Sequence, residues 1–480
     1  MTKNKGGRPK KPKSAQKKPV NASFSPRSAA ILKKKNNTSA YLDELVLRDN
    51  MQQIRLNKQP LDLLGYLTAL GTWRMVFQAD PRATFSWQEG GIIETYLDLA
   101  ALGTHILHDW RPLPVLHPWN GSTGFDGKAF EPLETIAGSK ANRLASYRKC
   151  IEVARRTKAA TGVEGKPDSK PPTKSAESRS EKHILLEALR GKMPDAYLEW
   201  LDAVVNLTDD GPLYNPILGT GGNIGRLDIQ RRYMESLLLV MDPETGGATA
   251  RAEGWLHHAL EGTNARGLPV GSMGQYSPST GTENHNPWHW LMLCEGAVML
   301  GAAAQRRYSA LPSYAAPEPF PWIVDYNGAG THHALSEGEA ELWLPCWLEH
   351  LSAPQAAHVL GEGYALTPAG KHPRDGVGFA MTAASGKLEP GLDGLRRGGN
   401  AFLRVGIVPN GQARNAVTFS EPQFTFPGLE TDWEKALQAH IKSEWERIYR
   451  VALGYGLEDT EARDAASRAI PEFRTPVAHV

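Results

Sequence analysis

Hydrophobic side chains recur every three to four positions in several long stretches of the chain, the spacing that places them on one face of an α-helix. This periodicity predicts helices over residues 61–77, 98–110, 141–160, 183–207, 250–261, 286–300 and 431–455. The stretch 286–300 is apolar nearly all round, which indicates a helix buried on every side. The chain therefore contains several amphipathic helices and one that is fully enclosed.

Polar and apolar positions alternate elsewhere, as they do in a half-buried β-strand. Residues 84–87 and 92–96 alternate on either side of a Glu-Gly-Gly turn at 89–91, which predicts a hairpin. From Pro312 onward the chain is rich in proline, glycine and short alternating runs, among which residues 340–347 stand out. We therefore expect an α+β fold class, a mixed multi-domain body with several amphipathic helices and short sheets.

Changes in composition divide the chain into segments. Residues 1–19 are basic and low in complexity, which predicts a disordered tail, and residues 161–182 have the composition of a linker. The expected segments are a disordered basic tail at 1–19, a ribbon-helix-helix-like unit or helical lead-in at 20–58, an N-terminal α+β domain at 59–160, a linker or flexible loop at 161–182, a helical region with a glycine loop at 183–310, a β-rich region ending in a helix at 311–460, and a frayed C-terminus at 461–480.

The net charge conceals an asymmetry between the tail and the body. The 480 residues hold 54 Lys and Arg against 52 Asp and Glu, a formal charge of +2. Twelve of the basic residues lie in residues 1–42, which contain no acid, so the remaining chain has 42 basic residues against 52 acidic ones, a formal −10. The basic character belongs to the tail, and binding of a polyanion by the body therefore requires local basic patches.

The tail contains a short motif typical of DNA binding. The sequence KGGRPKK at residues 5–11 resembles an AT-hook, in which arginine enters the narrow minor groove of A·T-rich DNA. Its candidate contacts are Arg8, Lys10 and Lys11, and the alternative is a nonspecific basic arm. Residues 20–49 then read as strand, helix and helix, similar to a ribbon-helix-helix DNA-binding unit, although a simple helical lead-in explains the pattern equally well.

Residues 215–228 form a glycine-rich loop that precedes an amphipathic segment. Four glycines within seven residues leave the backbone free to adopt positive φ and to approach another molecule closely. Amides exposed at the start of a helix, with arginines nearby, suit an anion such as a phosphate backbone. The candidate contacts are Gly219, Gly221, Gly222, Asn223, Arg226, Arg231 and Arg232.

This glycine pattern matches neither of the two common phosphate motifs. A dinucleotide-binding turn would have glycine where this chain has Ile224, and a Walker A loop would end in a Lys-Ser/Thr pair that the sequence lacks. The alternative interpretation is a tight, buried turn between two packed elements.

Two other stretches contain residues suited to nucleic acid. The Pro/Gly-rich residues 111–125 include Asn120, whose amide could hydrogen-bond a base edge. The predicted helix 141–160 carries Arg143, Arg148, Lys149, Arg155, Arg156 and Lys158. Such spacing spreads charge around a solvated helix as readily as it lines a nucleic-acid groove.

Catalytic motifs are not evident in the sequence. His285 and His289 are four residues apart, but Pro287 interrupts a helix between them, and the pattern His-Glu-x-x-His of zinc proteases is not met. No Gly-x-Ser-x-Gly nucleophile elbow occurs. We therefore expect a protein that is not an enzyme and that needs neither a cofactor nor a metal.

Cysteine usage and hydropathy bear on the compartment. No apolar run reaches the roughly 20 residues that span a bilayer, and the basic N-terminus lacks an apolar signal core. The expected location is the cytoplasm, with no membrane partner. Three single, widely spaced cysteines predict buried free thiols and no disulfide framework, namely Cys150, Cys294 and Cys346.

Five stretches with distinctive sequences occur in order along the first three quarters of the chain. They are LGYLTALG at 64–71, RPLP with PWNG and GF at 111–125, GTGGNIGRLD at 219–228, NPW with EGA at 286–297, and ELWLPCW at 341–347. Together these five landmarks resemble the large subunit of type I-G (formerly I-U) CRISPR surveillance complexes, the Csx-seventeen family. The likeness thins after residue 347, and Ile224 stands where the family's glycine loop has an acid.

The resemblance implies a nonenzymatic scaffold at one end of a guide-RNA complex. Its partners would be guide RNA, target DNA, the backbone and guide-processing subunits, and a docked helicase-nuclease. It would help recognise the target-flanking motif and stabilise the opened duplex, because base pairing reads the long sequence while protein reads a short motif and the backbone. The loop amides with Arg226, Arg231 and Arg232 would then contact the backbone, and Asn120 a base.

Two functions of other classes stay open. A DNA-binding regulator that works through its AT-hook-like and ribbon-helix-helix-like N-terminus predicts that residues 1–50 alone bind duplex DNA. A metal-dependent nuclease built on His285 and His289 predicts metal-dependent cleavage by the isolated chain.

Overall fold

The computed structural model describes the greater part of the body of the chain. The described residues are 51–56, 61–117, 125, 130–164, 167–168, 179–208, 211–215, 218, 226–261, 286–301, 323–324, 340–362, 364–365, 388–389, 401–410, 413–420, 445–450, 453 and 457–469. Contacts divide the chain into two units, Met1–Met51 and Gln52–Val480. The predictions for the basic tail, for residues 20–50 and for most of the linker therefore lie outside the described residues. So do those for Asn120, Gly219, Gly221, Gly222 and Asn223.

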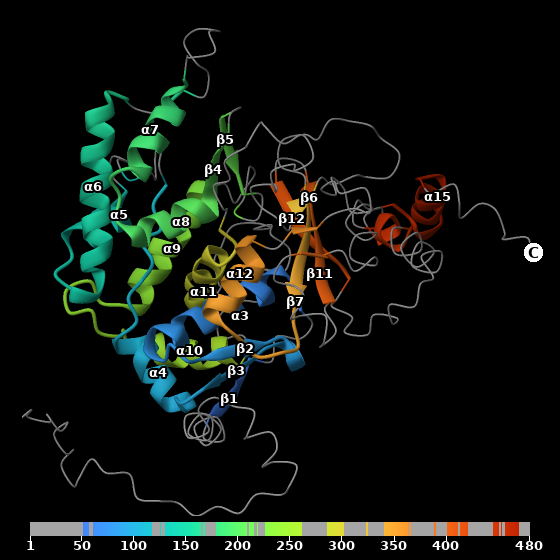
Figure 1. The fold of residues 1–480 in the computed structure, drawn as a ribbon, viewed down its shortest axis with the longest axis horizontal. Helices are drawn as coiled ribbons and strands as arrows, with labels where there is room; N and C mark the ends of the chain where they lie inside the picture. The colour runs from blue at the N-terminus through green and yellow to red at the C-terminus, as the bar shows by residue number, and fades with distance from the viewer. Residues whose placement is uncertain are drawn as a thin grey trace, which may run out of the picture. The chain divides into compact units, whose positions relative to one another are not determined.

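The predicted α+β fold class is confirmed, with helices and short antiparallel sheets in the same body (Figure 1). The main helices are α3 (Leu63–Ala79), α4 (Leu99–His108), α5 (Glu131–Gly138), α6 (Ala145–Thr161), α7 (Glu181–Arg190), α8 (Asp195–Val204), α9 (Arg226–Val240), α10 (Ala252–Leu260), α11 (Pro287–Val298), α12 (Ala353–Glu362) and α15 (Asp459–Ala469). Of the helix predicted over 431–455, the described residues 445–450 are helical.

One predicted helix is wrong in its extent. Residues 183–207 form two helices, α7 and α8, because Pro194 precedes the second helix with an extended backbone and cannot continue the first. Ser180 caps α7, and its hydroxyl accepts a hydrogen bond from the His183 amide at 3.3 Å. The last residues of the predicted helix instead form a strand, β4 (Val205–Thr208), which pairs with β5 (Gly211–Tyr214).

The predicted hairpin at 84–96 is confirmed and belongs to a four-stranded antiparallel sheet. Its strands are β2 (Thr84–Ser86) and β3 (Ile92–Thr95), and the sheet order is β1-β3-β2-β8, with β1 at Gln52–Arg55 and β8 at Leu351–Ser352. The turn requires glycine at Gly91, whose φ of +121° is strained for any other residue. Phe85 and Ile93 face the core. The pairing of β2 with β8 joins residues that are more than 250 positions apart in the sequence.

A second antiparallel sheet has the order β12-β11-β7-β6. Its strands are β6 (Ile323–Val324), β7 (Ala340–Cys346), β11 (Ala401–Asn410) and β12 (Ala413–Ser420). Residues 340–347, which stand out among the alternating runs of the sequence, contain β7, and this strand lies between two partner strands. A further pair, β9 (Tyr364–Ala365) with β10 (Leu388–Glu389), is also antiparallel.

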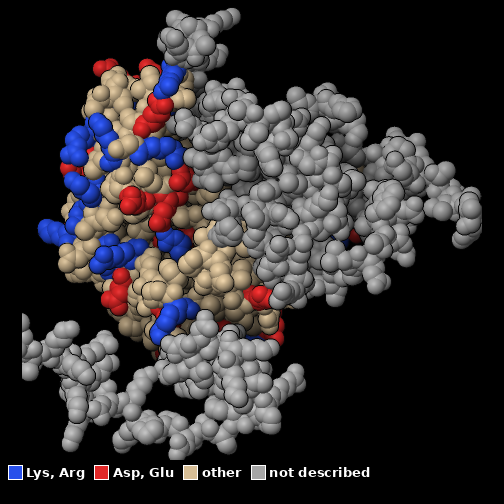
Figure 2. Space-filling view, viewed as in Figure 1, with Lys and Arg blue, Asp and Glu red and all other residues tan. Residues whose placement is uncertain are grey.

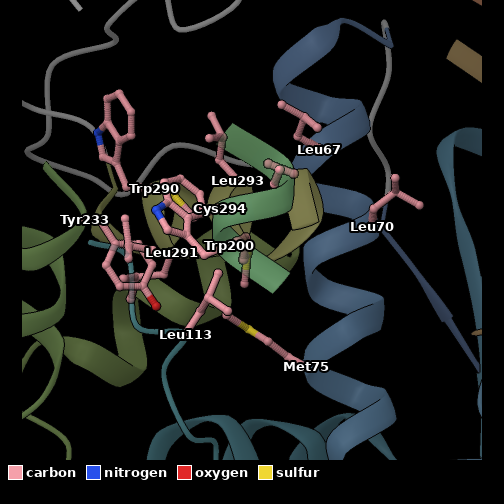
Figure 3. Close-up of a cluster of buried hydrophobic side chains, with 14 of the residues drawn as sticks. Leu67, Leu70, Met75, Leu113, Trp200, Tyr233, Trp290, Leu291, Leu293 and Cys294 are labelled. Atoms are coloured by element: carbon pink, nitrogen blue, oxygen red, sulfur yellow. The ribbon is translucent and has the colours of Figure 1, made fainter. Parts of the chain in front are cut away.

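The centre of the core is the crossing of α3 and α11. A Cβ added to Gly71 would lie 1.8 Å from the Met292 carbonyl oxygen, and one added to Gly296 would lie 1.9 Å from that of Leu67. Both distances are far below van der Waals contact, so the two helix backbones touch where only glycine fits. Figure 3 shows the side chains of both helices around this crossing, with Trp200 and Leu113 beside them.

One hydrophobic core cluster joins parts of the chain that the composition separates. It contains Trp73 from α3, Trp200 from α8, Trp288 from α11 and Trp347 just after β7. The segments predicted at 59–160 and 183–310 therefore share a common core. The three cysteines are buried and free, which confirms the prediction for them.

Candidate nucleic-acid interface

The glycine loop is anchored in the core at both of its ends. Before the loop, the backbone amide of Asn215 donates to the Val204 carbonyl and its side-chain amide donates to that of Ala203, each at 2.9 Å. After it, Ile229 and Gln230 of α9 are buried, and the Gln230 side-chain oxygen accepts a hydrogen bond from the His117 amide. The residues on both sides of the loop thus belong to the same packed interior.

The arginines that follow the loop have acidic neighbours on their own helix. Arg231 Nε lies 4.0 Å from Glu235 Oε1, and Arg232 Nη1 lies 3.7 Å from Glu235 Oε2. Their side chains are 39% and 29% exposed, while the opposite face of α9 is buried. Arg226 opens α9, and its side chain lies outside the described residues. Arg231 and Arg232 therefore both reach solvent. The helix α9 as a whole contains three basic and two acidic residues.

The basic residues predicted on the helix 141–160 divide into two groups in the structure. Arg143 is half-buried, and its guanidinium donates to the carbonyls of Ile106, Leu107, Trp110 and Gly246 at 2.6–2.9 Å. Burial lowers the pKa of this guanidinium to about 10, against the opposing effect of a nearby aspartate. Arg143 thus caps the C-terminal end of α4 and joins it to the loop at 246.

The other residues of this set differ in how far they are exposed. Lys158 is buried, and Arg148 and Arg155 each donate to a backbone carbonyl, at 2.6 Å to Ala141 and 2.7 Å to Phe125. Lys149 and Arg156 are 54% and 66% exposed. They share one acidic partner, Glu152, with N–O distances of 3.2 and 3.3 Å.

Figure 2 shows Lys and Arg side chains gathered over α6, at the left of the view. Lys140, just before this helix, adds a 78% exposed ammonium group that lies 2.9 Å from Glu244. We call Lys140, Arg148, Lys149, Arg155 and Arg156 the α6 basic face. Its exposed ion pairs contribute about 0–1 kcal/mol each, so solvent ions or a ligand can replace them at little cost.

A buried ionic network that the sequence did not predict connects α11 to α3. Glu295 of α11 is completely buried, with Oε1 accepting from Trp110 Nε1 and the Leu113 amide at 3.3 Å each, and Oε2 lying 3.2 Å from Arg74 Nη1. Arg74 also pairs with the half-exposed Glu199 of α8. Burial raises the pKa of Glu295, and Arg74 only partly offsets this. The signal available in the sequence was a single acid in an otherwise apolar helix.

Glu341 of β7 is a second fully buried glutamate. Its two carboxylate oxygens accept from Arg404 of β11 at 2.8 Å and from Arg447 of the helical residues 445–450 at 2.9 Å. Arg404 also lies over the Trp343 ring, 4.2 Å from its centroid. These contacts connect β7 to segments 63 and 106 residues later in the chain.

A serine, a histidine and a glutamate meet on the first sheet in an order like that of hydrolases. Ser86 Oγ lies 3.4 Å from His350 Nε2, and His350 Nδ1 lies 3.5 Å from Glu94 Oε2. A nucleophile must reach its substrate, and Ser86 has no exposed surface. The three residues connect β3, β2 and the segment before β8, and this arrangement is a cross-strand link.

The described residues contain neither a metal-ligand cluster nor a membrane-spanning helix. Among the described residues, no group of three or more His, Cys, Asp and Glu side chains could hold a metal ion. His289 is in α11, while His285 lies outside the described residues. Over the same part of the chain, every helix is too short or too polar to cross a bilayer.

Neither the protein-family models nor the curated proteins provide a match for this chain.

Proposed function

We propose that this protein is the nonenzymatic large subunit of a type I CRISPR guide-RNA surveillance complex. In this role it binds guide RNA and target DNA in the cytoplasm, helps recognise the target-flanking motif and stabilises the opened duplex. Its protein partners are the backbone and guide-processing subunits, and it docks a helicase-nuclease. The proposal starts from the five landmarks that resemble the Csx-seventeen family.

One structural observation supports the proposal most strongly: landmarks far apart in sequence are in direct contact. The Tyr66 hydroxyl of the first landmark donates to the Pro345 carbonyl of the fifth at 2.9 Å. Gly71 of the first meets the fourth at the α3–α11 crossing.

The remaining landmarks join the same assembly. The Leu113 amide of the second landmark donates to Glu295 of the fourth. His117, also in the second, donates to Gln230, two residues beyond the third. The contacts place the first, second, fourth and fifth landmarks in one packed body, and the second also contacts α9 just after the third. Such an arrangement is what a shared family fold requires.

The interior contacts also support a scaffold function. Two buried carboxylates of the landmarks, Glu295 and Glu341, are occupied with structural bonds. In guide-RNA complexes, base pairing reads the long sequence, and the protein supplies backbone contacts and reads a short duplex motif. Arg226, Arg231 and Arg232 are the proposed backbone contacts beside the glycine loop, and Asn120 is the proposed base contact.

Co-purification tests this proposal. The tagged chain is expressed with its neighbouring genes and a guide array, and the control uses an array whose repeats are scrambled. We expect guide RNA and backbone subunits to co-elute with the tagged chain in a fixed ratio, and to be lost in the control. A folded, tagged chain that elutes without RNA and without partners contradicts the proposal.

A second measurement separates the proposed subunit from a free DNA-binding regulator. Duplex DNA binding is compared between the full chain and a chain that lacks residues 1–50. The proposed subunit keeps target binding in its complex after this deletion. Loss of all DNA binding on deletion, together with the absence of guide RNA, would establish the regulator instead.

A further inference from the structure

We infer that the α6 basic face is the principal surface through which the body of this protein contacts the phosphodiester backbone of nucleic acid. The inference deepens the proposed function and rests on it for the identity of the nucleic acid. The residues concerned were one undivided group in the sequence, and the structure decides which of them face solvent.

Charge density favours α6 over the helix that follows the glycine loop. Outside residues 1–42 the chain has a formal charge of −10, so its average surface repels a polyanion. Within that background, α6 carries four basic residues and one acidic residue when the buried Lys158 is left out, whereas α9 carries three and two. The local excess is +3 on α6 and +1 on α9, which makes α6 the stronger attractor of phosphate.

The helix holds its exposed cations at a fixed spacing. Its inner face is buried through Tyr147, Cys150, Ile151 and Ala154, and the Tyr147 hydroxyl donates to the Val115 carbonyl at 2.7 Å. Lys149 and Arg156 are seven residues, or two turns, apart, which places them on one side of the helix about 10 Å from each other.

The contacts of these cations are of a kind that phosphate can replace. Lys149 and Arg156 share the single carboxylate of Glu152, which is itself 58% exposed. Such an exposed pair contributes little to stability, whereas a charge-assisted bond from arginine to phosphate is about twice as strong as a neutral hydrogen bond. Glu152 then acts as a weak competitor that phosphate displaces when nucleic acid binds.

The test is the salt dependence of nucleic-acid binding by the full chain in its complex. Each phosphate contact that is removed reduces the slope of log K against log salt by about 0.9 for duplex DNA and about 0.7 for a single strand. We expect Lys149→Gln with Arg156→Gln to reduce the slope by about 1.8 on duplex or about 1.4 on single-stranded RNA. Binding is measured separately with duplex DNA and with single-stranded RNA. The ligand for which the slope is reduced is the nucleic acid that the α6 basic face contacts.

A matched control removes two positive charges elsewhere. Arg55 pairs with Glu89 and is 52% exposed, and Arg251 is exposed at the start of α10. Arg55→Gln with Arg251→Gln changes the net charge by the same amount, so an effect specific to α6 exceeds that of the control. Glu152→Gln provides the opposite test, because removal of the competing carboxylate is expected to raise the affinity two- to fivefold.

The outcomes separate this inference from the proposed function. A complex that assembles with guide RNA, but whose salt slope is unchanged by the α6 substitutions in a folded chain, overturns the inference and leaves the proposed function standing. A chain that binds no guide RNA but loses salt-dependent nucleic-acid binding on α6 substitution supports the inference and contradicts the proposed function. Circular dichroism of each variant confirms that the fold is retained.

Discussion

The half-buried guanidinium of Arg143 donates to four backbone carbonyls, while on the outer face of α6 Arg156 contacts the exposed carboxylate of Glu152. The two arginines are only 13 positions apart in the sequence. The first is held by four backbone hydrogen bonds, and the second by an ion pair that salt screens. The interior arginines thus maintain the architecture, and the surface arginines are available to a ligand.

The same contrast extends to the landmarks and to the α6 basic face as wholes. The first and fourth landmarks meet at the α3–α11 crossing, where the backbones touch and Glu295 is enclosed. Changes in that region are expected to alter stability. Changes on the α6 basic face are expected to alter binding and leave stability nearly unchanged.

The largest effect is expected at the helix crossing. In Gly71→Ala the new methyl group would overlap the Met292 carbonyl, and because the obstacle is backbone, the helices must separate. We expect a loss of about 4 kcal/mol or more in the free energy of unfolding, or a chain that does not fold. Urea denaturation followed by tryptophan fluorescence measures the loss.

Gly103 in α4 is the matched control for this substitution. A Cβ at Gly103 would have no atom within 4 Å, so Gly103→Ala is expected to stabilise the chain by about 0.5–1 kcal/mol through helix propensity. Equal effects of the two alanines on the urea midpoint would show that the crossing is not as close as described.

A smaller effect is expected from the buried carboxylate of the same region. Glu295→Gln replaces the carboxyl group with a neutral amide of the same shape, so it is expected to cost about 1–2 kcal/mol at pH 4, where the wild-type carboxyl group is also largely neutral. Because burial raises the pKa of Glu295 in the folded state, the folded chain holds a proton that the unfolded chain has already released. The wild type should therefore lose stability as pH rises from about 4.3 to the raised pKa.

The pH profile of the variant provides the control for that prediction. Glutamine does not titrate, so the difference in stability between wild type and Glu295→Gln should narrow as pH rises through this range. Chemical denaturation at pH 4 to 7 measures it. A constant difference across the range would mean that the pKa of Glu295 is the same in the folded and unfolded chains.

A still smaller effect is expected at Tyr233 of α9. Its hydroxyl is buried and has no hydrogen-bond partner among the residues that the structure describes, and burial raises its pKa well above the usual value. Removing a buried polar group that has no partner relieves a desolvation cost, so Tyr233→Phe should be neutral or stabilise the chain by up to about 1 kcal/mol. Tyr147→Phe, which removes the bond to Val115, is the matched control and should destabilise by about 1 kcal/mol. If Tyr233→Phe destabilises the chain as much as Tyr147→Phe does, the Tyr233 hydroxyl makes a stabilising hydrogen bond and the prediction is wrong.

The smallest effect on stability is expected on the α6 basic face. Lys149→Gln with Arg156→Gln removes two exposed ion pairs, and the urea midpoint should shift by less than the equivalent of about 1 kcal/mol. A large loss of stability would place these residues with the interior arginines and would remove the basis for assigning them to binding.

Local elements were predictable from the sequence where one kind of signal dominated. The period of the apolar residues gave α3, α4, α6, α10 and α11 to within a few residues, and alternation with a glycine turn gave the β2–β3 hairpin. The single helix predicted over 183–207 failed because a break at Pro194 leaves the apolar period unchanged on both sides.

The candidate site was less predictable, because it depends on which face of an element is covered. Arg143 and Arg156 look alike in sequence, and only the packing of α4 and the loop at 246 encloses the first. The network of Glu295 was equally hidden, since its partners come from α3 and from the segment that follows α4, which the fold brings together.

Cross-linking of the assembled complex tests the contrast between interior and surface most directly. Ultraviolet irradiation attaches bound nucleic acid to the residues it touches, and mass spectrometry identifies the peptides. The account predicts cross-linked peptides from Lys140 through α6, with none from the α3 and α11 landmarks. Cross-links that fall on α3 or α11 and spare α6 would contradict it.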